Sequence, residues 1–132
     1  MSSRAISCVV VLKGGPSVER EVSLVSGREV ASALREEGFQ VVELDAGPSL
    51  TADLVAAKPD VVFNALHGRW GEDGCVQGLL EWLQIPYTHS GVMASAMAMD
   101  KEQTKRLYKS VGLPIAESML VSKKDVQAGH PM

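Results

Sequence analysis

Residues 67–74, with the sequence HGRWGEDG, combine one imidazole, two carboxylates and three glycines. An apolar run at residues 61–66, typical of a buried strand, comes directly before them. Glycine lets the backbone approach a bound molecule closely, and the titratable side chains supply hydrogen-bond donors and acceptors. The segment therefore predicts a ligand-binding loop at the end of a strand.

Simpler interpretations of the same loop remain open. His67 can be a strand-end histidine whose ring binds a nearby backbone carbonyl. Asp73 is placed to cap the helix that follows, with Glu72 close to the positive end of its dipole. A metal site is disfavoured because these three side chains lack a compact ligand spacing, and no Gly-x-Ser-x-Gly element is present for a nucleophilic serine.

A second glycine-containing loop, residues 14–20 with the sequence GGPSVER, follows an apolar run at residues 6–12. It lacks the third glycine of a dinucleotide fingerprint and the Gly-Lys-Ser/Thr of a P-loop. Backbone amides and a helix N-terminus would attract a carboxylate, whereas Glu19 would attract an ammonium group. The loop therefore favours a small zwitterion, although Glu19 and Glu21 could equally do no more than complement the helix dipole.

Strand and helix patterns alternate along the chain, which predicts an α/β fold with an open, mostly parallel sheet and helices on both faces. In such sheets ligands bind at the carboxyl ends of the strands, where both loops would lie. The expected strands are residues 6–12, 39–44, 61–66 and 85–88, and the expected helices are residues 17–37, 50–57, 76–83 and 92–99.

Two further expectations concern the end of the chain. The Met and Ala stripe at residues 92–99 predicts a core helix. Residues 100–111 form a further helical pattern, residues 116–121 are strand-like, and residues 123–132 begin another helix. We therefore expect an N-terminal domain over residues 1–100 and the start of a second domain over residues 101–132.

The composition is that of a globular protein, with 45% hydrophobic and 22% charged residues. A formal charge of −3 without a basic cluster gives no reason to expect nucleic acid, and no apolar run is long enough for a signal peptide or a membrane span. Cys8 and Cys75 are expected to be reduced, packed thiols, and the cytoplasm is the default location.

Taken together, five blocks in this order resemble the D-alanine–D-alanine ligases of the ATP-grasp superfamily. They are residues 14–23 (GGPSVEREVS), 66–74 (LHGRWGEDG), 86–88 (PYT), 90–91 with 94–95 (SG and AS) and 99–101 (MDK). The family commonly has glycine where His89 stands, and its members are considerably longer. The resemblance implies a Rossmann-like pre-ATP-grasp domain, then the beginning of an ATP-grasp central domain, so we expect an N-terminal part of the enzyme that is inactive alone.

By this resemblance, the full enzyme uses ATP to phosphorylate the carboxylate of one D-alanine. The amine of a second D-alanine then attacks the acyl phosphate, and the dipeptide enters peptidoglycan synthesis. ATP and Mg²⁺ or Mn²⁺ are implied, with the metal ligands expected beyond residue 132 and none in this chain. The family also implies a homodimer.

The resemblance assigns roles to five residues. Glu19 would be the catalytic and substrate-binding residue that grips the ammonium group of the first D-alanine, with Ser17 and Val18 beside the same substrate. His67 would lie by that substrate's carboxylate as an imidazole donor. Lys101 would reach the ATP phosphates, although a surface helix lysine is the simpler reading.

Three alternatives remain. A related ligase would join D-alanine to a different second substrate such as D-lactate. A non-catalytic module would bind a small ligand without chemistry. A phosphoacceptor signalling domain is disfavoured, because the acidic cluster expected after its first strand is missing.

Overall fold

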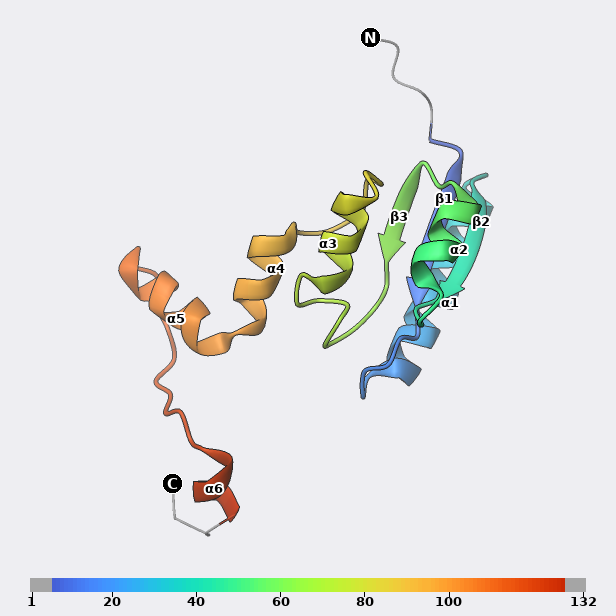
Figure 1. Cartoon of the computed structure of the whole chain (residues 1–132). Helices are drawn as coiled ribbons and strands as arrows, with labels where there is room; N and C mark the ends of the chain where they lie inside the picture. Colours follow the sequence, from blue (N-terminus) through green and yellow to red (C-terminus); the bar gives the residue numbers. More distant parts are fainter. Residues whose placement is uncertain (1–5, 128–132) are drawn as a thin grey trace. The chain divides into compact units, whose positions relative to one another are not determined.

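The computed structural model describes residues 6–127. Its centre is a parallel sheet with the strand order β2-β1-β3 (Figure 1). The strands are β1 (Cys8–Lys13), β2 (Gln40–Asp45) and β3 (Val61–Asn64). Val11 of β1 pairs with Glu43 on one side and with Phe63 on the other. The predicted parallel sheet is confirmed, and all three strands end at the same edge.

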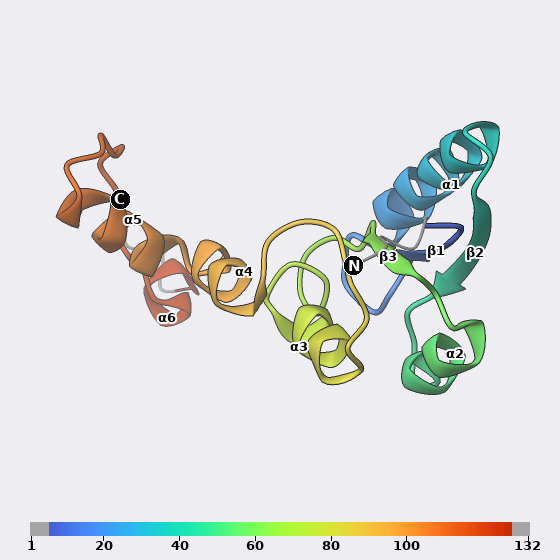
Figure 2. The same ribbon diagram turned by 90° about the horizontal axis from the view of Figure 1, so that it is seen from above.

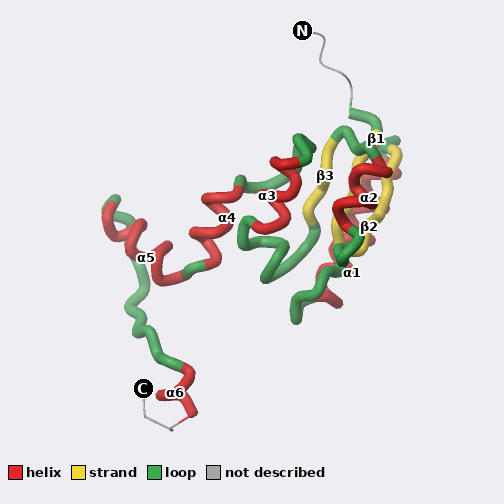
Figure 3. The backbone as a smooth tube through the Cα atoms, viewed as in Figure 1, coloured by secondary structure: helices red, strands yellow, loops and turns green. Residues whose placement is uncertain are grey.

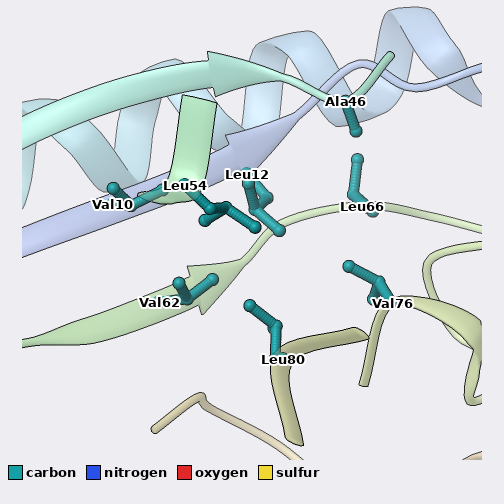
Figure 4. Packing of buried hydrophobic residues seen from close by; sticks show 8 residues of the cluster. All are labelled: Val10, Leu12, Ala46, Leu54, Val62, Leu66, Val76 and Leu80. Carbon is teal, nitrogen blue, oxygen red and sulfur yellow. The ribbon is translucent and has the colours of Figure 1, made fainter. Parts of the chain in front are cut away.

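Helices cover both faces of this sheet, as predicted. Figure 2 shows α1 (Arg20–Glu36) on one side and α2 (Leu50–Ala57) with α3 (Cys75–Trp82) on the other. Alternate residues of β1 face opposite sides because successive strand side chains point in opposite directions. The core under α2 and α3 comprises Val10, Leu12, Ala46, Leu54, Val62, Leu66, Val76 and Leu80 (Figure 4). The core under α1 comprises Val9, Val11, Ala31 and Ala65.

Close packing of α1 on β1 depends on Gly27. A Cβ atom added there would lie 2.4 Å from Cβ of Lys13, well inside the closest normal approach of two carbon atoms. The glycine therefore lets the helix backbone approach the end of β1. This approach brings the N-terminal half of α1 alongside the segment that leaves β3.

The fourth predicted strand, residues 85–88, is reduced to a single parallel bridge between Val62 and Tyr87. The N–H of Val62 donates to Pro86 O at 2.8 Å, and the N–H of Thr88 donates to Val62 O at 3.0 Å. The next ladder bond would run from Asn64 N to the carbonyl of Thr88. The N–H of Asn64 instead donates to Oγ1 of Thr88 at 3.1 Å, so the side chain ends the ladder.

The expectation that residues 92–99 form a core helix is wrong. They do form a helix, α4 (Val92–Met99), but Met93 is 78% exposed and Met97 is 38% exposed. Only Ser95 is buried. Among residues 6–99, the main packing partner of α4 is α3. An apolar composition predicts burial only where a partner is present to provide it.

The chain divides into two compact units between Met99 and Asp100. The second unit contains α5 (Lys101–Ser110) and α6 (Lys123–Gln127). Asp100 caps α5 by accepting a hydrogen bond from Gln103 N at 3.0 Å. The strand expected at residues 116–121 does not form, and Figure 3 shows a loop between the two helices. The described part of this unit contains no strand with which these residues could pair. The helix expected over 123–132 falls partly outside the described residues.

No helix within residues 6–127 combines the length and apolar character needed to cross a membrane.

Candidate functional site

The loops that follow β1 and β3 meet at the carboxyl edge of the sheet. Oγ of Ser17 donates a hydrogen bond of 2.8 Å to the carbonyl oxygen of His67. The carboxylate of Glu19 lies against Gly68, where an added Cβ atom would fall 2.4 Å from Oε2. Ser17, Glu19 and His67 are therefore brought together, while the side chain of Val18 is fully exposed.

The loop of residues 67–74 is folded by its own carboxylates. Oε2 of Glu72 accepts from Gly68 N at 2.6 Å, so this side chain turns back into the loop. Asp73 accepts from Trp70 N at 3.0 Å and from Cys75 N at 3.1 Å. Burial alone would raise the pKa of Asp73, but these backbone hydrogen bonds outweigh burial, and the pKa is lowered.

Asp73 is not the N-cap residue that the sequence predicts. Gly74 occupies that position with φ +92°, a conformation that favours glycine, and Asp73 binds the first helical N–H from one residue further back. Cys75 is exposed, contrary to the expectation of a packed thiol. Its side-chain hydrogen bond with Asp73 raises the pKa of that thiol.

Two buried amide side chains bind the backbone of the loop of residues 67–74. Nδ2 of Asn64 donates to Gly71 O at 2.8 Å, and Nε2 of Gln77 donates to the same oxygen at 2.9 Å. Oδ1 of Asn64 accepts from Leu66 N at 3.2 Å. Sequence reasoning missed both residues. Asn64 could have been noticed, because it is an amide at the end of an otherwise apolar strand. A buried polar side chain requires hydrogen-bond partners, and the following loop could supply them.

The first loop is fastened by an ion pair between Arg20 and Asp45. Nη1 and Nη2 of Arg20 lie 2.7 and 2.5 Å from the two carboxylate oxygens, and Asp45 also accepts from Gly15 N at 3.2 Å. The hydrogen bond from Arg20 lowers the pKa of Asp45. Arg20 is thus committed to Asp45, and no cation within residues 6–127 forms an ion pair with the neighbouring Glu19.

A cavity of about 370 Å³ opens between the loops that follow the three strands. That volume suits a small molecule. The lining is largely apolar, with Ser17, His67 and Arg69 as its polar side chains. Its other walls come from Gly14, Gly15, Pro16, Ala46, Gly47, Pro48, Leu50, Leu66, Trp70, Gly71, Cys75, Val76 and Leu79.

The imidazole of His67 is held by side chains and not by a backbone carbonyl. Its Nε2 lies 3.2 Å from Oγ of Ser26, and its Nδ1 lies 3.9 Å from Oε1 of Glu72. His89 makes the carbonyl contact instead, with its Nε2 at 2.9 Å from Asn64 O. His89 also has φ +76°, which explains why glycine suits this position in a related loop.

Lys101 lies in the second unit, residues 100–127. With Lys105, Arg106 and Lys109 of α5 it lines an open cavity of about 830 Å³, whose opposite wall is residues 115–120. Glu102 and Glu117 line the same cavity, Arg106 is paired with Glu102, and Lys105 donates to Ala116 O at 3.1 Å. Within residues 6–127 there is no cluster of three His, Cys, Asp or Glu side chains that would hold a metal ion.

The chain is similar in sequence to known D-alanine–D-alanine ligases. The family described as D-ala D-ala ligase N-terminus matches residues 46–90. The D-alanine–D-alanine ligase of Ruegeria pomeroyi is 68% identical over all 132 residues of the chain. Along its whole length the chain is similar to the N-terminal portion of a D-alanine–D-alanine ligase. The corresponding ligase of Dinoroseobacter shibae is 64% identical over the same length.

Solved ligase structures share the fold. The Bacillus anthracis D-alanine–D-alanine ligase complexed with ATP is 32% identical, with a TM-score of 0.72, and the match covers 92% of this chain and 44% of that one. The Aeromonas hydrophila ligase is 26% identical with a TM-score of 0.76, covering 89% of this chain and 51% of that one. The expected fold class is confirmed. The chain spans 43% of the length of the Ruegeria and Dinoroseobacter relatives.

Proposed function

We propose that this chain supplies the first D-alanine site of an ATP-dependent D-alanine–D-alanine ligase that serves peptidoglycan synthesis. The observation that carries the proposal is the position of Glu19. Its carboxylate lies beside the His67 loop at the carboxyl edge of the sheet, and Arg20 is already paired with Asp45. A carboxylate without a cation partner among residues 6–127 suits the ammonium group of a small amino acid.

In the proposed reaction, the γ-phosphoryl group of ATP passes to the carboxylate of the first D-alanine. The amine of a second D-alanine attacks the acyl phosphate, the peptide bond forms and phosphate leaves. Glu19 holds the first ammonium group, with Ser17 and Val18 beside the same substrate. His67 faces its carboxylate. Positioning of two small reactants accounts for a large part of such catalysis, because it removes the entropic cost of their encounter.

Lys101 is proposed to contact the ATP phosphates. It lines a cavity with three other cations, which supports a phosphate-binding role. A divalent cation, Mg²⁺ or Mn²⁺, would neutralise the transferring phosphoryl group and would be held by residues outside this chain. We further propose a cytoplasmic homodimer, by analogy with the family.

A chimeric ligase tests the proposal. In this protein, residues 1–132 of the chain replace the matching segment of the Ruegeria pomeroyi ligase. We expect phosphate release from ATP that depends on D-alanine, with D-alanyl-D-alanine as the product. Release that D-alanine does not stimulate, in a folded chimera, would contradict the proposal.

A further inference from the structure

Three serines in and just before α1 bind residues 65–67, which follow β3. Oγ of Ser23 donates to Ala65 O at 2.7 Å, and Oγ of Ser17 donates to His67 O at 2.8 Å. Both bonds fix the backbone of this segment. The third serine, Ser26, reaches the imidazole itself, with Oγ at 3.2 Å from Nε2 of His67. Ser26 therefore acts on the orientation and proton placement of the ring.

The hydroxyl of Ser26 has one proton and two acceptors within reach. Oγ lies 3.0 Å from the carbonyl oxygen of Val22 and 3.2 Å from Nε2 of His67. Val22 O lies inside α1, where it accepts the helical N–H four residues later, so this oxygen is satisfied without the hydroxyl. The Ser26 proton is therefore available to Nε2 without leaving a backbone group unpaired.

Glu72 acts on the opposite edge of the same ring. Its Oε1 lies 3.9 Å from Nδ1 of His67, too far for a hydrogen bond but close enough for an electrostatic effect. A carboxylate repels a nitrogen lone pair and attracts an N–H group. Glu72 is held in this place by the 2.6 Å bond from Gly68 N. The two neighbours therefore favour the same placement of the ring proton, on Nδ1.

We propose that Ser26 is a positioning residue that donates to Nε2 of His67 and thereby keeps the neutral ring in its Nδ1–H tautomer. The Nδ1–H group is then the donor to a substrate carboxylate. This second statement rests on the proposed function. The tautomer itself does not, because it is a property of the ligand-free chain.

The tautomer is measured by ¹⁵N NMR of the imidazole in the ligand-free 132-residue chain, at alkaline pH, where histidine rings are neutral. We expect Nδ1 to carry the proton in the unsubstituted chain. Ser26→Ala should switch the dominant tautomer to Nε2–H, the form that a free histidine side chain favours in water. Ser26→Thr keeps the hydroxyl and should keep Nδ1–H. Ser32→Ala is the matched control and should change nothing, because Ser32 is an exposed serine of the same helix that donates to Glu36.

A proton on Nε2 of His67 in the unsubstituted chain would overturn the proposal. In that case the Nε2–H would donate to Oγ of Ser26, and the Ser26 hydroxyl would donate to the carbonyl oxygen of Val22. An unchanged tautomer in Ser26→Ala would overturn it as well. The first result is obtained without any variant, so misfolding of Ser26→Ala leaves the test intact.

A second measurement separates this inference from the proposed function. In the chimeric ligase, Ser26→Ala should raise the KM for the first D-alanine about 3- to 10-fold, the range of one ordinary hydrogen bond, and Ser26→Thr should restore it. A switched tautomer with an unchanged KM would overturn the carboxylate role of His67 while leaving the Ser26 contact correct. D-alanine-independent ATP turnover would overturn the proposed function and leave the tautomer result standing.

Discussion

Glu19→Gln in the chimeric ligase is expected to reduce kcat/KM for D-alanine about 10- to 100-fold. A hydrogen bond between charged groups contributes about 1.5–3 kcal/mol, and each ~1.4 kcal/mol is a factor of ten. Glutamine preserves the size of the side chain but removes the charge that attracts the ammonium group. Because Glu19 has no cation partner among the described residues, its neutralisation should cost little stability.

Glu21→Gln is the matched control for this measurement. Glu21 is an exposed carboxylate in the first turn of the same helix, so its replacement alters the helix dipole interaction to a similar extent. We expect kcat/KM for D-alanine to change less than threefold, or about 0.6 kcal/mol, in this variant. Equal losses in the two variants would mean that Glu19 only complements the helix dipole.

Gly71→Ala is expected to lower the free energy of unfolding by at least ~3 kcal/mol. An added Cβ atom would lie 2.4 Å from Cβ and 3.0 Å from the carbonyl carbon of Leu66, so the backbone must move. Overpacking of this kind costs about 1–3 kcal/mol. Displacement of the Gly71 carbonyl would also leave the buried amides of Asn64 and Gln77 without their acceptor, at about 1–3 kcal/mol for each unpaired group.

Urea denaturation of the 132-residue chain, followed by circular dichroism, measures this effect. Gly47→Ala is the control, because an added Cβ there meets nothing within 4 Å. Gly47 also lines the cavity, so the pair compares two glycines of the same site. We expect Gly47→Ala to remain within about 0.5 kcal/mol of the unsubstituted chain. A Gly71→Ala variant of equal stability would contradict the packing described for the loop.

The sheet could be predicted from the sequence because residues 6–12 and 61–66 are apolar runs, which favour strands covered on both faces. The limits of the strands depended on contacts distant in sequence. The N–H of Asn64 donates to the side-chain oxygen of Thr88 and not to its carbonyl oxygen, and this ends the ladder. Amino-acid composition does not predict such a change of acceptor. The prediction that α4 is buried was wrong, because only Ser95 of this helix is buried. An apolar composition does not tell whether another element covers the helix.

The candidate site was predictable in its residue types but not in its supports. Glycines and titratable side chains after β1 and β3 indicated the two loops, and the parallel sheet implied that they share an edge. The ring contact of Ser26 with His67 joins residues that are 41 positions apart. Its existence follows from the close approach of α1 at Gly27, a packing detail that a sequence pattern does not carry. The roles of Glu19, His67, Ser17, Val18 and Lys101 stay predictions.

The most direct test of the D-alanine site is a crystal structure of the chimeric ligase with D-alanine and an unreactive ATP analogue. We expect the ammonium nitrogen of the first D-alanine at hydrogen-bonding distance, about 3 Å, from the Glu19 carboxylate. We also expect the substrate carboxylate on the Nδ1 side of His67. D-alanine bound with its ammonium group away from Glu19 would contradict the assignment.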